Sequence, residues 1–102
     1  MTTHPILFQP GRCGITHGAL ARLQAHGVTP AEMLFLHLQL DPGSACLEDQ
    51  AANHSALETG ARILSFFHLV AGDDYTRIWL ITDAEDDDGV RASTLILLPE
   101  EY

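Results

Sequence analysis

Residues 62–83 contain two largely apolar segments on either side of a polar turn, and this pattern predicts a β-hairpin. Its two strand segments, 62–70 and 75–82, together hold six β-branched and four aromatic residues, which are the types that pack well on a pleated sheet. The Gly-Asp pair between the two segments is typical of a tight turn. A further strand is predicted over 92–98, where an aliphatic run ends at Pro99.

Three segments before the hairpin have the spacing and end signals of helices. The first runs from Thr16, the expected N-cap, to a left-handed stop at Gly27. The second begins with a capping box at 29–32 and continues over 33–40, where it is hydrophobic on nearly all sides. The third covers about 47–59, with two acids in its first turn, and is followed by a glycine.

The order of these elements, helices first and strands afterwards, predicts one α+β domain over 1–102. We expect a small antiparallel sheet of three or four strands with two to three helices packed on one face. Both faces of the predicted strands carry apolar residues, so the second face must be covered by a helix or by another subunit. The pattern at 6–8 leaves two alternatives open, a short edge strand and a hydrophobic anchor.

Length and composition indicate a soluble globular protein. The chain has 102 residues, 46% of them hydrophobic and 19% charged, which is enough to bury a core without disulfides. No apolar run approaches the roughly 18–20 residues of a membrane span, and the first eight residues lack the basic and apolar regions of a secretory signal. We therefore expect a cytoplasmic protein, with Cys13 and Cys46 as reduced, partly buried thiols.

The net charge excludes some partners. Fourteen acids stand against five arginines and no lysine, giving −9, so the surface should repel nucleic acid and anionic membranes. The charge is also uneven, because residues 73–102 hold nine of the acids and two of the arginines. One strongly negative end of the molecule is therefore predicted.

Residue patterns for catalysis or metal binding are incomplete. The spacing of Cys13 and His17 suits a zinc ligand pair, but no second pair follows. The acidic loop at 83–94 lacks the glycine and the last glutamate of an EF-hand. No serine elbow, activated cysteine or phosphate-binding glycine loop is present. The sequence predicts a protein that is not an enzyme and that has no cofactor and no metal site.

Several short motifs resemble a family of small bacterial proteins described as plasmid-related, which occur on plasmids and integrative elements. The similarity covers about 11–102, and its motifs are Thr16-x-Gly18-Ala19-Leu20, Glu48-Asp49-x-Ala51-x-Asn53, Ala61-Arg62-Ile63-Leu64-Ser65, Ile78-Trp79-x-Ile81-Thr82 and Leu97-Leu98-Pro99-Glu100-x-Tyr102. The resemblance implies a mobile-element role but brings no established activity. Two segments depart from the family: 40–44 replaces a Gly-Asp-Trp-Gly-Asp-like stretch, and 85–89 is an acidic insertion.

Acidity and this resemblance together suggest a non-enzymatic inhibitor of a host defence or nucleic-acid-handling protein, of the anti-CRISPR or anti-restriction type. Such a protein would bind a basic surface on its partner. The residues expected to make this contact are acidic and come from two loops: Asp73, Asp74, Asp83, Glu85, Asp86, Asp87 and Asp88. Two alternatives stay open, a homodimeric binding module that uses the helix at 33–40 or the free sheet face, and a small enzyme built from scattered histidines and acids.

Overall fold

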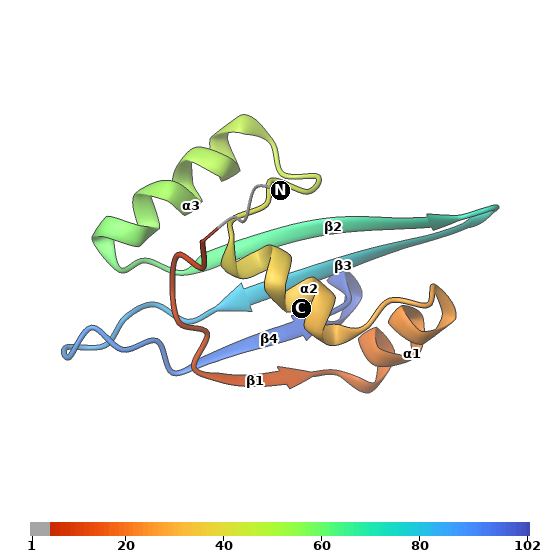
Figure 1. Cartoon of the computed structure of the whole chain (residues 1–102), viewed down its shortest axis with the longest axis horizontal. Helices are drawn as coiled ribbons and strands as arrows, with labels where there is room; N and C mark the ends of the chain where they lie inside the picture. Colours follow the sequence, from red (N-terminus) through yellow and green to blue (C-terminus); the bar gives the residue numbers. More distant parts are fainter. Residues whose placement is uncertain (1–4) are drawn as a thin grey trace.

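A computed structural model describes residues 5–102 and shows a four-stranded sheet with three helices (Figure 1). In chain order the elements are β1 (Arg12–Ile15), α1 (His17–Ala25), α2 (Pro30–Leu38), α3 (Leu47–Thr59), β2 (Ile63–Ala71), β3 (Asp74–Thr82), β4 (Ser93–Leu97) and the 3-10 turn η1 (Pro99–Glu101). The predicted α+β class and small sheet are confirmed. The expectation about a secretory signal in the first eight residues falls partly outside the described residues.

The predicted hairpin is confirmed, and it forms one half of the sheet. β2 and β3 pair antiparallel from Ile63 opposite Thr82 to Ala71 opposite Asp74. The turn between them contains Gly72 with φ +61, a backbone conformation that glycine adopts without steric cost. β4 continues the sheet antiparallel to β3.

The expectation of a purely antiparallel sheet is wrong, because β1 pairs with β4 in parallel and makes the sheet mixed. β1 has four residues that are mostly exposed and include a glycine, so no local pattern indicates a strand there. It is held by backbone bonds to a segment distant in sequence, such as that from the Thr16 amide to the Ile96 carbonyl at 3.0 Å.

Residues 6–8 act as the hydrophobic anchor, the second of the two alternatives. Phe8 packs on a small cluster formed by Leu40, Ala56 and Ile63. The Leu7 amide also donates to the Leu38 carbonyl at 2.9 Å. The segment therefore ties the N-terminal part of the chain to the end of α2.

The helix caps lie where the sequence predicts them. The Thr16 side chain accepts a bond from the α1 backbone, and Thr29 and Glu32 form the reciprocal capping box of α2. α2 ends at Leu38, two residues earlier than predicted. The reason is that Leu40 takes a left-handed conformation, φ +55, which buries its side chain.

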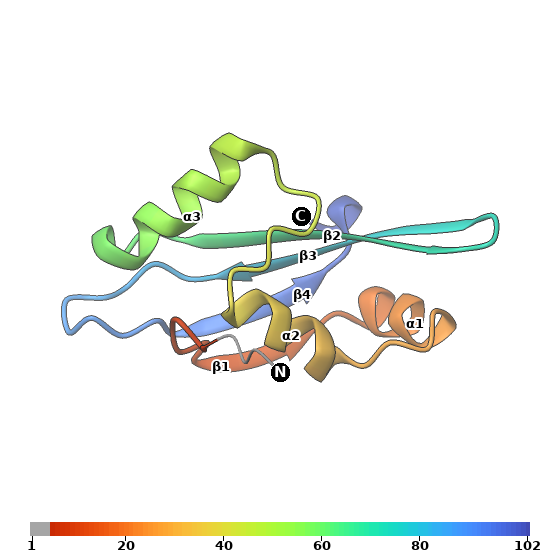
Figure 2. The ribbon, with the colours of Figure 1, turned by 45° about the horizontal axis from the view of Figure 1, so that its top comes forward.

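The main core lies between the sheet and helices α1 and α2, which cover one face (Figures 1 and 2). α3 lies beside the β2 edge instead. No helix of the described chain is long and apolar enough to cross a membrane. The buried side chains of this core are Ala19, Leu23, Met33, Phe67, Ile78, Leu80 and Ile96.

Candidate functional site

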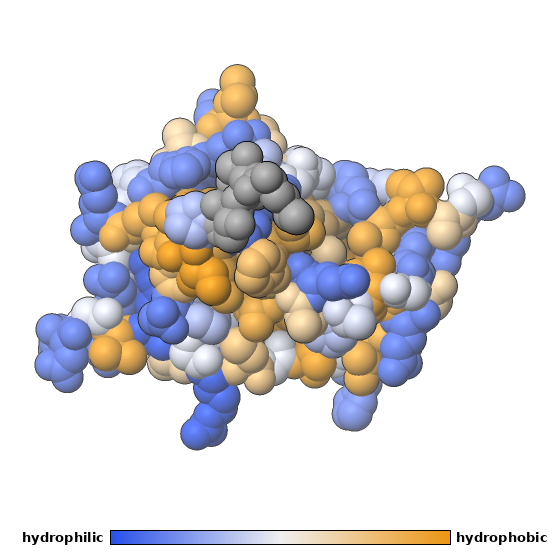
Figure 3. All heavy atoms as spheres, viewed as in Figure 1, coloured by the Kyte–Doolittle hydropathy of each residue, from blue (hydrophilic) through white to orange (hydrophobic). Residues whose placement is uncertain are grey.

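The acids predicted to form one negative end lie at opposite ends of the sheet. Asp73 lies in the β2–β3 turn and Asp74 begins β3, whereas residues 83–88 belong to the β3–β4 loop (Figure 1). Asp83 follows the nine-residue strand that begins at Asp74, so the two acids are about 30 Å apart along the extended chain. Figure 3 shows hydrophilic surface at both of these ends. The prediction of a single anionic pole is therefore wrong.

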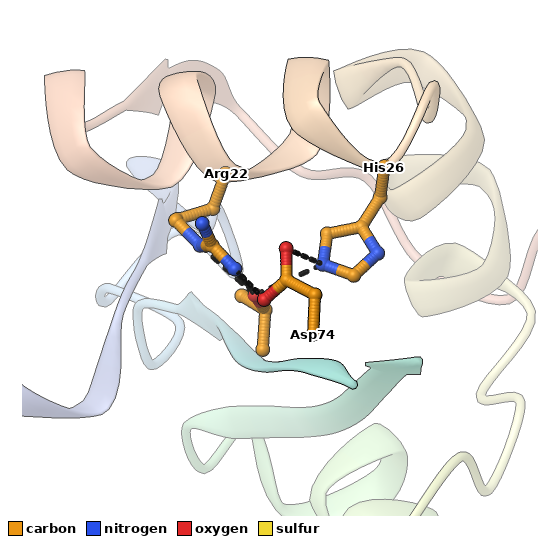
Figure 4. Close-up of polar contacts among 4 residues, drawn as sticks. Arg22, His26 and Asp74 are labelled. Carbon is orange, nitrogen blue, oxygen red and sulfur yellow. Dashed lines mark hydrogen bonds and ion pairs between the residues drawn. The ribbon is translucent and has the colours of Figure 1, made fainter. Parts of the chain in front are cut away.

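Asp74 has partners within the molecule (Figure 4). It forms an ion pair with Arg22, and its other oxygen lies 3.5 Å from Nε2 of His26. Arg22 of α1 and His26, the C-cap of that helix, also reach the hydroxyl of Thr76, at 2.9 Å from Arg22 Nε and 3.0 Å from His26 Nε2. This cluster fastens α1 to the start of β3, so Asp74 serves the fold.

Three of the loop acids also bind within the chain. Asp83 accepts a bond from the Ser93 hydroxyl at 2.9 Å, and Glu85 lies 3.9 Å from the Arg91 guanidinium. Asp86 accepts from two backbone amides of its own loop, those of residues 88 and 90, each at 2.9 Å. Among the predicted site residues, the side chains without an intramolecular partner in the described structure are Asp73, Asp87 and Asp88.

Sequence reasoning missed a buried polar network centred on His37. Its ring nitrogens Nδ1 and Nε2 lie 2.6 Å from the Ser65 hydroxyl and 2.7 Å from the Thr82 hydroxyl. Thr82 contacts Thr94 at 2.6 Å, and Thr94 donates to the Pro10 carbonyl at 2.8 Å. The Pro10 carbonyl can only accept, so the Thr94 hydroxyl donates to it, the Thr82 hydroxyl donates to Thr94, and Nε2 of His37 donates to Thr82. The proton of the neutral ring is therefore on Nε2.

Burial decides the charge of His37. The side chain is fully buried, and desolvation lowers its pKa from 6.5 to about 4. The neutral ring joins α2 to two strands and to the N-terminal segment. Both nitrogens are occupied and no solvent reaches them, so this group holds the core together. The sequence signal that could have indicated this network is a histidine within an apolar helix together with a serine and a threonine within the apolar strands.

The cysteines and the apolar helix also differ from expectation. Cys13 and Cys46 are free thiols, as predicted, but both are exposed where partial burial was expected. Within residues 5–102 no group of three or more metal-ligating side chains comes together. α2 turns Met33 and His37 inward and exposes Phe35, at 49%, above a shallow apolar groove. The helix expected to be apolar on nearly all sides thus leaves one aromatic ring outside.

The second face of the sheet is open, apart from a partial cover by the chain's last residues. Successive strand residues point to opposite faces, so the side chains beside those that pack on α1 and α2 line the opposite side. We call this surface the open face; its residues are Arg62, Leu64, Phe66, His68, Val70, Tyr75, Arg77, Trp79, Ile81, Leu95 and Tyr102, and Leu97 on the same side is buried.

Aromatic rings on the open face touch one another across the strands. Phe66 and Trp79 meet edge to face at 5.3 Å, and Trp79 meets Tyr102 at 5.6 Å. His68 and Tyr75 form a second pair, with the phenol oxygen 2.7 Å from the imidazole Nδ1. Tyr75 and Tyr102 remain 49% and 66% exposed. A row of rings is thus held in place while one side of it faces solvent.

Arginines without a carboxylate partner accompany these rings. In the described chain, the arginines that form ion pairs are Arg22 and Arg91, and neither lies on the open face. Arg62 donates to the Tyr102 hydroxyl at 3.3 Å, and the Arg77 guanidinium lies over the Tyr75 ring at 5.8 Å. The open face therefore combines aromatic rings with arginines that form no ion pair, in a molecule of net charge −9.

Two further polar residues lie where β1 and β4 begin. Arg12 is exposed and is the register partner of Ser93, so it lies on the same side of the sheet. The carboxylate of Asp83, bound to the Ser93 hydroxyl, lies near this end of the face. None of the strand residues around Phe66, Trp79 and Arg77 on this face is acidic.

The last residues of the chain form a clasp across one end of the sheet. Glu101 accepts bonds from the Thr16 hydroxyl at 2.7 Å and from the Leu98 amide at 2.8 Å. Both bonds lower the pKa of Glu101, and the bond from Thr16 has the larger effect. The clasp positions Tyr102 against Trp79.

Comparison with protein-family models, curated proteins and solved structures found no significant match to this chain. The resemblance to the plasmid-related family therefore stays a prediction. The residues of the open face and of the two acidic turns remain as the basis for a functional proposal.

Proposed function

We propose that this protein acts by binding another protein, and that the open face is the binding surface. The observation that carries the proposal is the pairing of solvent-facing aromatic rings with arginines that have no carboxylate partner. Tryptophan, tyrosine and arginine are the residue types that dominate binding energy at protein interfaces. A contiguous exposed apolar patch on a small protein is typical of an interaction site.

A second candidate is the inhibitor suggested by acidity, which would use the β3–β4 loop against a basic partner such as a host defence protein. The observation in its favour is the ordered form of this loop. Asp86 binds the amides of residues 88 and 90, and Gly89 takes φ +76. Asp87 and Asp88 are thereby presented to solvent, so association would be fast at low salt and slower at high salt.

Two double variants separate these candidates. Arg62→Glu with Arg77→Glu reverses charge on the open face, and Asp87→Asn with Asp88→Asn removes it from the loop. All four side chains are exposed, so we expect native circular dichroism for both proteins. Partners captured by the parent protein are identified by mass spectrometry, and their affinity is then measured by calorimetry.

We expect the arginine variant to lose at least tenfold in affinity and the loop variant to retain the parent affinity. The reverse result would transfer the function to the acidic loop. If both variants bound as tightly as the parent protein, neither surface would be the site.

A further inference from the structure

The structure shows one segment already in contact with the open face, and its chemistry indicates the kind of partner that fits. Residues 98–102 read Leu-Pro-Glu-Glu-Tyr. The Tyr102 ring contacts Trp79, and its hydroxyl receives a bond from Arg62. Glu100 lines a shallow hollow together with Tyr75 and Arg77. An aromatic side chain and an acidic side chain thus occupy neighbouring parts of this surface.

The two arginines are spaced for an extended peptide. Arg77 is paired with His68 across the two strands. His68 lies six residues after Arg62, which is about 20 Å along an extended strand. The apolar row of Phe66 and Trp79 lies between them. A peptide of about six residues in extended form spans that distance, with carboxylates at its ends and an apolar or aromatic side chain at its middle.

The edge of β2 near Leu64 and Phe66 cannot accept such a peptide as an added strand. The side chain of Asn53 bonds both the amide and the carbonyl of Leu64, and Ser44 bonds the carbonyl of Phe66. These are the outward backbone groups that an added strand would need. A ligand at this level must therefore lie across the face and be recognised by side chains.

Charge distinguishes between classes of occupant. A second copy placed face to face would bring arginines against arginines, which is unfavourable. A nucleic acid carries a charge at every phosphate and would be repelled by the net charge of −9. A short peptide with two or three carboxylates gains the local attraction of Arg62 and Arg77 and meets less of the overall repulsion.

We propose that the open face recognises a short acidic peptide segment carrying an aromatic side chain, bound across β2 and β3 between Arg62 and Arg77. This inference rests on the proposed function and names the class of partner. The segment 98–102 occupies part of the site in the isolated chain, so an external peptide competes with Tyr102.

The test uses the full chain carrying Tyr102→Ala, which removes the competing ring, and Trp79 as reporter, since the chain contains one tryptophan. The probe is the six-residue peptide Glu-Ser-Tyr-Leu-Ser-Glu, which has a carboxylate at each end and an aromatic side chain near its middle; it is blocked at both ends and titrated to millimolar concentration. The matched controls replace both glutamates by glutamine or the tyrosine by alanine. A twelve-residue oligothymidylate is titrated in parallel.

We expect a saturable change in Trp79 fluorescence with the acidic peptide and at least fivefold weaker binding of each control peptide. Adding Arg62→Glu and Arg77→Glu to the receptor should abolish the preference for glutamate over glutamine. Because Tyr102 is largely exposed, the receptor should keep its fold. The parent chain provides a second receptor, with weaker binding of the same peptide.

Equal binding of the glutamate and glutamine peptides would overturn the inference, as would tighter binding of the oligothymidylate or no binding by any probe. These failures leave the proposed function standing if the arginine variant still loses its captured partner. If that variant keeps its captured partner, the proposed function falls whatever the peptides do.

Discussion

His37 shows how burial changes the role of a residue. The chain contains six histidines, residues that can serve in metal binding or acid–base chemistry. In the fold its ring lies in the core, bonded on both sides, and its pKa falls to about 4 through desolvation. Such a group is neutral at physiological pH and contributes to stability through its two hydrogen bonds. The role of His37 can be tested by measuring how the free energy of unfolding depends on pH.

Between pH 6.5 and 4 the unfolded chain binds a proton at His37 that the folded chain does not. Stability from this group is therefore complete above pH 6.5, declines as the pH falls, and is fully lost near pH 4. Over that window the free energy of unfolding should decrease by about 3 kcal/mol through His37. Urea unfolding followed by circular dichroism at several pH values measures the slope.

The control is His37→Gln, which keeps hydrogen-bonding groups in the core and removes the titration. The variant should be less stable at pH 7 and should show a shallower decrease in unfolding free energy toward pH 4. Parallel pH profiles for the two proteins would show that His37 does not titrate as its burial requires.

At the scale of elements, the strand β2 is protected by a single side chain of α3. Asn53 offers one donor and one acceptor, bonded to the Leu64 carbonyl at 2.6 Å and to its amide at 3.1 Å. This arrangement imitates a neighbouring strand over one residue. Exposed strand edges are templates for aggregation, and capping them is a known protection. α3 therefore owes its position to this contact as well as to its apolar packing.

Asn53→Ala should lower the free energy of unfolding by about 2 kcal/mol, because it leaves two partly buried backbone groups without partners. It should also increase aggregation on mild heating, measured by light scattering. His54→Ala is the matched control: His54 is the next residue on the same helix and is exposed, so a change within about 0.5 kcal/mol is expected. Equal effects of both substitutions would contradict the edge-capping role.

At the scale of the whole molecule, charge and hydrophobicity are arranged differently from what the totals imply. The acids divide between two ends of the sheet, and the arginines without ion pairs lie on the open face. Helices α1 and α2 cover the other face (Figure 2). The protein therefore has acidic side chains at the two ends of the sheet and aromatic rings with arginines on one of its faces.

The clasp formed by residues 98–102 gives a direct test of this surface. Tyr102→Ala removes the ring that contacts Trp79, so quenching of Trp79 fluorescence by acrylamide should increase by about twofold. Tyr102→Phe keeps the ring and should leave quenching near the parent value while losing the bond from Arg62. Unchanged quenching in the alanine variant would mean that the ring does not cover Trp79 in solution.

The local elements could be predicted from the sequence because their causes are local. The capping box at 29–32 and the two apolar segments around the turn within 62–83 place helices and strands to within a few residues, and the errors fall where a distant contact decides. β1 exists because β4 lies beside it, and α2 ends early because Leu40 is buried against α3 and β2. Neither contact is indicated by the residues that are adjacent in the sequence.

The sequence by itself determined the α+β class, the hairpin, the three helices and the total charge. Only the tertiary structure decided which acids are free, which arginines lack partners and which face of the sheet stays open. The physical reason is that composition is a sum over residues, whereas a site depends on which side chains meet across strands and helices. A strand 30 Å long, about nine residues at 3.3 Å each, is enough to separate Asp74 from Asp86, acids that the sequence suggests are neighbours.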